Sequence, residues 1–288
     1  MDVASLLHEL TPEAERLLAR HDATSKPWYP HALVPWGRGR DFDEDYEWSA
    51  AEAGLPDALR SALFVNLLTE DNLPYSFRDV QRMFGRDGVW GEWGRRWTAE
   101  EGRHAIVIRD YLTVTRALDP VELENARIAQ VSGGQVPEPP TALDGFAYLT
   151  LQELATRIAH RQTAKLIDDE AGYRVMARVG ADENYHFLYY RDLAQAALRI
   201  DPSAMMIAID EQVRGFSMPG TGIPNFAQHS RAIANAGIYN LTIHHDQILA
   251  PIVLRYWDIG HLESLTPEAE QAREACVAWI ARIEKVGR

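Results

Sequence analysis

The sequence lacks the features by which secreted and membrane proteins are usually known. Its single cysteine, Cys276, excludes an internal disulfide and is typical of a protein in a reducing compartment. No apolar run approaches the roughly 18 residues of a membrane-spanning helix, and residues 248–254, among the longest such runs, contain Pro251. The first twenty residues carry acids and lack the basic start of a signal peptide. We therefore expect a soluble, cytoplasmic protein that does not enter the membrane.

Positive charge is also scarce. The chain has 29 lysines and arginines against 42 aspartates and glutamates, which gives a formal net charge of −13. Nonspecific binding of nucleic acid requires a basic surface, so we expect no nucleic-acid partner. An acidic protein partner would need a local basic patch that acts against the overall negative field.

Strand patterns are nearly absent, and we find no repeat and no low-complexity segment. A hydrophobic content of 46% is sufficient for a large core. Residues 25–54, 132–141 and 217–224 are predicted to be irregular. Apolar residues at helical spacing predict helices over residues 3–19, 55–84 (broken or bent near Pro74), 90–117, 142–168, 170–200, 226–236, 242–256 and 266–286, with two more starting at Asp119 and Asp201. Helices of this length predict one large bundle, a single domain over residues 1–288.

Two Glu-x-x-His motifs indicate where chemistry could reside. Glu101 precedes His104 by three residues, and Glu183 precedes His186 in the same way. On a helix, residues three apart share a face, so each pair could bind one metal ion together. With 22 glutamates and 10 histidines, about one such pair is expected by chance, so the spacing alone is weak evidence.

Two further glutamates complete a recognisable arrangement. Glu70 and Glu153 each lie on an apolar helix face, so the chain alternates single-glutamate helices with Glu-x-x-His helices. That is the pattern of the carboxylate-bridged metal pair in ferritin-like four-helix bundles. Four buried carboxylates would repel one another unless two divalent cations cancelled their charge, and oxygen-rich ligation favours iron or manganese over zinc. We predict an all-α, ferritin-like di-iron bundle of about ten helices.

These motifs and their flanks resemble the soluble acyl-acyl-carrier-protein desaturases, the plant stearoyl-carrier-protein desaturases and their actinobacterial relatives. The resemblance runs from about residue 5 to 260 and departs at Gly102 and Ala105, where the family usually has asparagine and glycine. The segments that carry it are Lys26-Pro27-Trp28, Thr69-Glu70-Asp71-Asn72-Leu73-Pro74, Trp90-Gly91-Glu92-Trp93, Arg96-Trp97-Thr98-Ala99-Glu100-Glu101, Arg103-His104, Gln152-Glu153, Ala155-Thr156, His160, Thr163, Ala181-Asp182-Glu183-Asn184, His186 and Phe216-Ser217-Met218-Pro219-Gly220.

The resemblance implies a role for each site residue. Thr156 would lie beside the oxygen site and assist proton delivery, although its hydroxyl could simply bond back to its own helix. Trp28 and Asp182 would form an electron path from the surface, although Trp28 could equally be a packing residue. Two iron ions, cycling between Fe2+ and Fe3+ and replaceable by manganese, would be bridged by Glu101 and Glu183, with the remaining ligands supplied by Glu70, His104, Glu153 and His186.

The implied reaction is the O2-dependent insertion of a double bond into a fatty acyl chain carried on acyl carrier protein, in fatty acid biosynthesis. A ferredoxin-type donor would supply electrons to a homodimeric enzyme. The acidic carrier would need a basic patch, for which the candidates are Arg78, Arg82, Arg86, Arg95 and Arg96. Three alternatives remain: hydroxylation or N-oxygenation of a specialised carrier-tethered substrate, iron storage, which the chain length disfavours, and metal-free binding of an acyl carrier.

Overall fold

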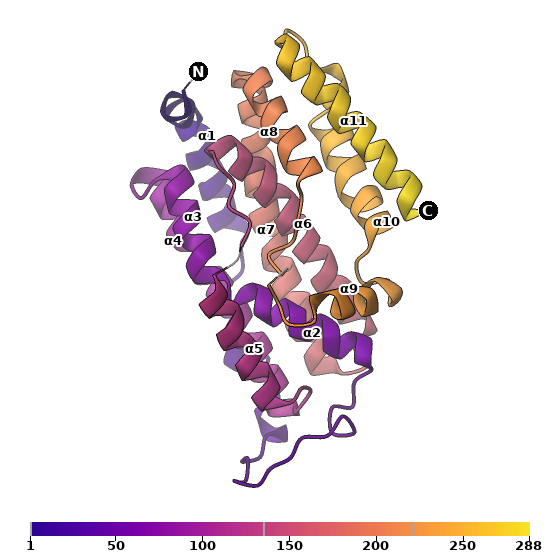
Figure 1. The fold of residues 1–288 in the computed structure, drawn as a ribbon. Helices are drawn as coiled ribbons and strands as arrows, with labels where there is room; N and C mark the ends of the chain where they lie inside the picture. The colour runs from indigo at the N-terminus through magenta and orange to yellow at the C-terminus, as the bar shows by residue number, and fades with distance from the viewer. Residues whose placement is uncertain (1, 135, 221) are drawn as a thin grey trace.

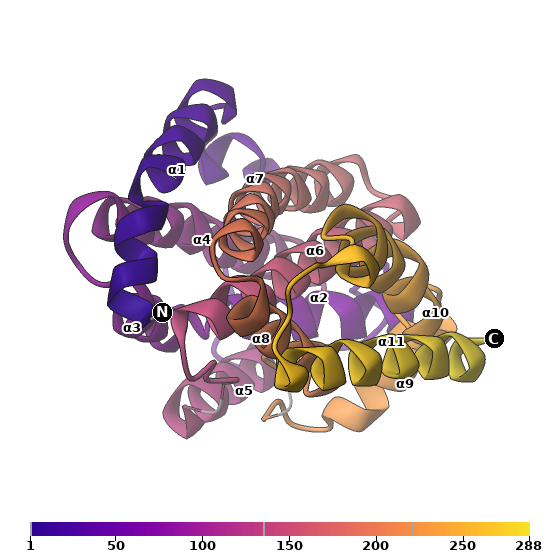
Figure 2. The same cartoon turned by 90° about the horizontal axis from the view of Figure 1, so that it is seen from above.

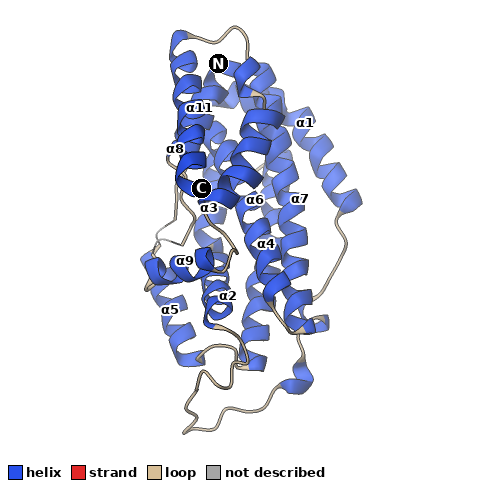
Figure 3. Cartoon of the chain, turned by 90° about the vertical axis from the view of Figure 1, so that its right-hand side faces the viewer, coloured by secondary structure: helices blue, strands red, loops and turns tan. Residues whose placement is uncertain are grey.

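The computed structural model describes residues 2–134, 136–220 and 222–288, and all regular elements in these ranges are helices (Figure 3). The α-helices shown in Figure 1 are α1 (Val3–Thr24), α2 (Asp57–Glu70), α3 (Leu73–Phe84), α4 (Gly88–Thr115), α5 (Pro120–Gly133), α6 (Ala142–Leu166), α7 (Glu170–Ile200), α8 (Pro202–Arg214), α9 (Phe226–Asn235), α10 (Leu241–His244) and α11 (Pro267–Gly287). Short 3-10 helices span Pro30–Ala32, Trp36–Arg38 and Ile259–His261, and a π-helix spans His245–Tyr256.

Local sequence signals explain where several helices begin. Asp119 accepts hydrogen bonds from the backbone at the start of α5, and Pro120 occupies the first turn, as predicted. Asp201 caps α8 in the same way. At α6, Thr141 and Asp144 form a reciprocal capping box. Each such cap contributes about 1 kcal/mol, so the helix starts are encoded locally.

Two predicted helical stretches are interrupted or distorted near a proline. The stretch over residues 55–84, predicted to be broken or bent near Pro74, is two helices, and the break falls at Asp71 and Asn72. The helix predicted over residues 242–256 winds mostly as a π-helix. Pro251 lies within it and has no N–H to complete an α-helical hydrogen bond, so the wider winding accommodates the proline.

Four helices form the bundle that was predicted. Helices α6 and α7 pack along their lengths, α4 packs on α7, and α2 closes the ring by packing on both α4 and α6 (Figures 1 and 2). Helix α1 lies against α7 and α4, α8 packs on both α6 and α7, and α11 packs on α8. The expectation of an all-α, ferritin-like bundle is confirmed, and its four motif-bearing helices are neighbours.

Two apolar clusters fill this bundle, one toward each end. Trp97 of α4 and Phe187 of α7 belong to one cluster, whereas Val107 and Val179 of the same helices belong to the other. The motif residues lie between these positions on both helices. The polar side chains therefore form a layer that is enclosed by apolar packing on either side. Among the helices of the described ranges, none is long and apolar enough to cross a bilayer.

Candidate metal centre

The structure brings all six predicted ligand residues together in the middle of the bundle, and all six are buried. Their candidate ligand atoms form two groups, each within 4.8 Å, and the groups are Glu70, Glu101, His104 and Glu183, then Glu101, Glu153, Glu183 and His186. Glu101 and Glu183 are common to both groups. This is the arrangement that two ions with two shared carboxylates require.

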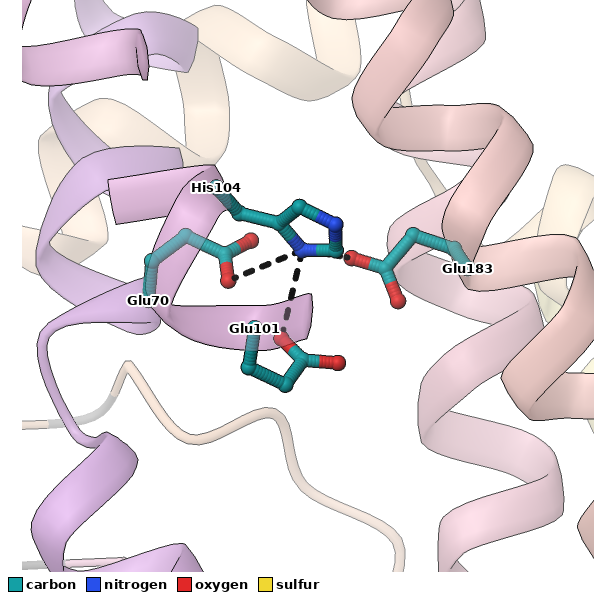
Figure 4. Close-up of side chains that lie close together, drawn as sticks. All are labelled: Glu70, Glu101, His104 and Glu183. Carbon is teal, nitrogen blue, oxygen red and sulfur yellow. Dashed lines mark ion pairs between the residues drawn. The ribbon is translucent and has the colours of Figure 1, made fainter. Parts of the chain in front are cut away.

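Both imidazoles direct their Nδ1 atom toward these carboxylates. Nδ1 of His104 lies 3.3 Å from Glu101, 3.5 Å from Glu183 and 3.7 Å from Glu70 (Figure 4). Nδ1 of His186 lies 2.8 Å from Glu101 and 3.7 Å from Glu183. Each histidine thus presents Nδ1, not Nε2, to a space surrounded by carboxylate oxygens.

Several buried atoms that face this space have no hydrogen-bond partner. They are Oε1 of Glu101, Nδ1 of His104, Oε2 of Glu153, Oε2 of Glu183 and Nδ1 of His186. Leaving a buried polar atom unpaired costs about 1–3 kcal/mol, and more when it is charged. Two divalent cations would satisfy these atoms together and balance four carboxylates. The donor set, mostly oxygen with one imidazole in each group, fits iron or manganese.

The protonation of the cluster reflects the same crowding. Burial, followed by repulsion from the Glu183 carboxylate, raises the pKa of Glu153 well above its usual value and also raises the pKa of Glu101. Burial acts in the same direction on Glu183, but the nearby histidines, His104 among them, outweigh it and lower its pKa. Without metal, the cluster therefore holds protons that binding of a cation must displace.

Each histidine is held by a carboxylate from the opposite helix. Nε2 of His104 lies 3.4 Å from Asp182 on α7, and Nε2 of His186 lies 3.0 Å from Glu100 on α4. Asp182 and Glu100 each directly precede the shared glutamate of their own motif, so the relation is reciprocal. His21 of α1 contacts the same carboxylate oxygen of Glu100, also at 3.0 Å. Such partners fix the tautomer that leaves Nδ1 free for a metal.

Trp28 lies next to Asp182 and His104. Its indole Nε1 donates a hydrogen bond of 2.6 Å to Asp182, and its ring is nearly parallel to that of His104 at 6.3 Å. The guanidinium of Arg103 covers the indole at 4.9 Å. A continuous series of contacts therefore runs from Trp28 through Asp182 to His104.

Two further buried residues contact the candidate ligands and were not predicted. Nε2 of His160 lies 3.1 Å from Glu70 and 3.4 Å from Glu183. The indole of Trp97 donates a 3.0 Å hydrogen bond to Glu153. These contacts orient the carboxylates whose remaining oxygens face the centre.

Comparison with known proteins decides which family this architecture represents. A family model described as fatty acid desaturase matches residues 2–288. The chain belongs to the fatty acid desaturase family. Membership makes it an enzyme, an oxidoreductase, and sets aside the alternatives of iron storage and metal-free carrier binding.

Individual relatives agree with this assignment. The protein named acyl-acyl-carrier-protein desaturase DesA1 of Mycobacterium tuberculosis is 40% identical over 289 residues, which cover 97% of this chain and 85% of the relative. The chloroplastic stearoyl-acyl-carrier-protein 9-desaturase of Simmondsia chinensis is 28% identical over 292 residues, covering 95% of this chain and 73% of the relative. The X-ray structure of DesA2 from M. tuberculosis H37Rv superposes with a TM-score of 0.76 at 25% identity, covering 93% of this chain and 99% of that one.

Thr156 lies at the edge of the desaturase centre. Its Oγ1 donates to the backbone carbonyls of Glu153, at 3.0 Å, and Gln152, at 3.2 Å. This is the back-bonding alternative raised from the sequence, and the role of Thr156 in proton delivery stays a prediction.

Two cavities of the desaturase share lining residues, Thr156 among them. One lies between α3, the segment containing Val136, and the face of the centre formed by Glu101 and Glu183. The other lies between α2, α6 and α9 and has a largely apolar lining that includes Phe226. Thr69, Glu70 and Thr156 border both cavities. A flexible chain that occupied both would therefore pass the centre.

The arginines proposed as a carrier-docking patch are partly engaged within the chain. Arg78 forms a 2.7 Å ion pair with Glu138, and Arg96 forms a 3.1 Å pair with Asp22. Arg82 donates to a backbone carbonyl of the 136–140 segment. The patch stays a prediction.

Proposed function

We propose that this enzyme inserts a double bond into a fatty acyl chain carried on acyl carrier protein, as part of fatty acid biosynthesis. O2 serves as the oxidant and a ferredoxin-type protein as the electron donor. The observation that carries the proposal is the pair of overlapping carboxylate and imidazole groups, with unpaired ligand atoms, beside two cavities that share lining residues. The names of the relatives support the substrate class.

The proposed ligands are the six residues of the centre, with Glu101 and Glu183 shared between two iron ions. When bound, the iron pair supplies O2 chemistry that no side chain can perform. The reaction balances as follows: the acyl chain loses two hydrogen atoms from adjacent CH2 groups, the donor adds two electrons and the solvent two protons. Together these reduce one O2 to two waters.

The protein's own contribution is to position the chain and exclude water. Adjacent CH2 groups of an acyl chain are chemically alike, so only their placement can decide which pair reacts. Apolar side chains such as Phe226 and Ile233 line one cavity, and Leu73 and Val80 line the other. Because Thr156 lines both cavities, an acyl chain that occupied them would have one segment next to the metal centre. This requirement explains why the ligands lie in a buried layer and not in a surface cleft.

Electrons enter, in this proposal, through Trp28. Its hydrogen bond to Asp182 and the contact of Asp182 with His104 link the centre to α1 and its following segment. Trp28 is 7% exposed, so its ring lies just beneath the surface. Arg103 and Arg178 cover the indole and also contact Asp182.

Product analysis tests the proposed function. Protein reconstituted with iron is supplied with acyl carrier proteins bearing saturated chains, a plant-type ferredoxin with its reductase, and O2. We expect mass spectrometry to show loss of two hydrogens. Addition of one oxygen would instead support the hydroxylase alternative.

The matched variants carry substitutions inside and outside the centre. Glu153→Ala with His186→Ala removes two proposed ligands and should abolish both iron binding and product. Glu92→Ala removes an exposed glutamate of α4 and should change neither. Wild-type product from an iron-free double variant would contradict the proposal.

A further inference from the structure

A groove on the outer side of α6 and α7 is lined by basic side chains (Figure 2 shows the two helices side by side). Arg157, Arg161 and Lys165 follow one another at four-residue spacing along one face of α6. Small residues of α7, among them Ala177 and Gly180, form its floor. A Cβ at Gly180 would lie 3.1 Å from Cγ of Arg161, so the arginine stem crosses directly over the glycine.

The charge of this groove contrasts with that of the chain. Residues 154–166 contain three basic residues and no acid, and residues 171–181 add Arg174 and Arg178, again with no acid. Within the part of the chain that the structure describes, Arg157 and Arg161 form no ion pair. Nε of Arg157 is buried and lacks a hydrogen-bond partner. These charges are therefore available to a negatively charged partner.

The electrostatics of Arg157 favour the binding of an anion. Burial, followed by repulsion from Arg161, lowers the pKa of the Arg157 guanidinium. Arginine nevertheless stays protonated at neutral pH. An anionic group in the groove would relieve the repulsion between the two guanidinium groups.

The groove lies close to the metal centre and to the Trp28 contacts. Asn184, which lines the groove, directly follows Glu183, so about one helix diameter, roughly 10 Å, separates the groove from the centre. Arg178 precedes Asp182 by one turn on the adjoining face of α7 and forms an ion pair with it. A partner bound along this face would thus reach both the groove and the surroundings of Trp28.

We propose that this groove, together with Arg174 and Arg178, is the docking site of the electron donor, a small acidic protein that carries one electron at a time. The inference rests on the proposed function, in which a donor supplies two electrons per double bond. A basic patch on an acidic protein attracts and orients an acidic partner, and its effect falls with ionic strength.

Acyl carrier protein is also acidic, but the groove does not suit it. The carrier must deliver its chain where one of the two cavities opens. Neither cavity shares a lining residue with the groove. The carrier and the electron donor would therefore bind to different faces of the enzyme.

Charge reversal tests the docking site. Arg161→Glu with Lys165→Glu reverses two exposed charges of the groove, and Arg282→Glu with Lys285→Glu makes the same charge change on an exposed face of α11. The probe is a plant-type ferredoxin, with binding to the iron-loaded enzyme measured by titration calorimetry at several salt concentrations. We expect the groove variant to bind about tenfold or more weakly than the α11 variant at low salt, with the difference shrinking as salt rises.

Acyl carrier protein serves as the second probe and should bind both variants equally. Equal ferredoxin affinity of the two variants, or a selective loss of carrier binding in the groove variant, would overturn the proposal. Chemical reduction bypasses docking, so the groove variant should then form product at the wild-type level in a single turnover. Absence of product from chemically reduced wild-type enzyme would count against the proposed function and not against the docking site.

Discussion

The orientation of the two histidines depends on residues that are not themselves in the candidate ligand set. Burial alone would raise the pKa of Glu100, but hydrogen bonds from His186 and His21 outweigh it and hold the pKa well below its usual value. Glu100 is therefore ionised when it contacts His186. Asp182 serves His104 in the same way, and burial there too is outweighed by the hydrogen bond from the histidine. The two halves of the centre are thus built alike.

Removing Glu100 tests this role. Glu100→Ala should leave the His186 ring free to rotate and lower the affinity for a divalent metal by about 10–100-fold. Anaerobic titration with Co2+ measures the affinity without relying on turnover. The exposed Glu92→Ala on the same helix is the control. Unchanged affinity in Glu100→Ala, with the helix content of the wild type, would contradict a positioning role.

Single residues also show how far the sequence could predict the centre. The three-residue spacing within each motif is local, so Glu101 with His104 and Glu183 with His186 could be paired from the sequence. The contact of Glu100 with His186 spans 86 residues, so the spacing within either motif does not predict it. The signal that could have revealed it is the acid that precedes the glutamate of both motifs.

The break between α2 and α3 is the element-scale feature that positions Glu70, the last residue of α2. Asn72 in this break is 1% exposed. Its side chain donates a 2.7 Å hydrogen bond to the carbonyl of Pro219 and accepts one of 3.0 Å from Gln130. The break is therefore tied to α5 and to the loop before α9, and it holds the end of α2 against the centre.

Loss of these hydrogen bonds should lower both the free energy of unfolding and the binding of metal. Asn72→Ala leaves the buried amide of Gln130 and the Pro219 carbonyl without partners, which should cost about 1–3 kcal/mol of unfolding free energy. Urea unfolding measures the cost, and metal content reports on Glu70. Ser203→Ala, in α8, is the comparison variant, because it also removes a hydrogen bond, the one that the Thr266 backbone donates to Ser203. An equal loss in both variants would contradict a special role for the break.

Helix starts were predicted well because their signals are local, as at Asp119 and Asp201, where an aspartate precedes a proline. The π-helical winding around Pro251 was not predicted, because a proline in an apolar run indicates a disturbance but not its form. The neighbour relations of α2, α4, α6 and α7 depend on long-range packing. From the sequence they followed only because the pattern of glutamate and Glu-x-x-His helices matches that of ferritin-like bundles.

At the scale of the whole molecule, the buried centre links metal binding to pH and stability. Burial alone would lower the pKa of His104 and His186, but neighbouring carboxylates outweigh it and raise both pKa values well above 6.5. The pKa values of Glu101 and Glu153 are raised as well, so they affect the pH dependence of stability in the same direction. Groups with a raised pKa stabilise the fold at low pH, and that stability is lost as pH rises through the raised values. The lowered pKa of Glu183 acts only at acid pH.

We therefore expect the metal-free protein to become less stable as pH rises above about 6.5, by up to about 1.4 kcal/mol per pH unit for each proton released. Protein loaded with metal holds its ligands deprotonated and should not show this decline. Calorimetric melting of both forms between neutral and alkaline pH measures the difference. A metal-free protein whose melting temperature rises over that interval would contradict the account.

The central claim is that the six buried residues form one site for two metal ions. The most direct measurement is the metal content of the protein after anaerobic reconstitution with Fe2+ and removal of excess iron, alongside its helix content. The account predicts about two irons per chain, falling in Glu153→Ala with His186→Ala while Glu92→Ala keeps both. Iron far below one per chain in a fully helical wild-type protein would contradict it.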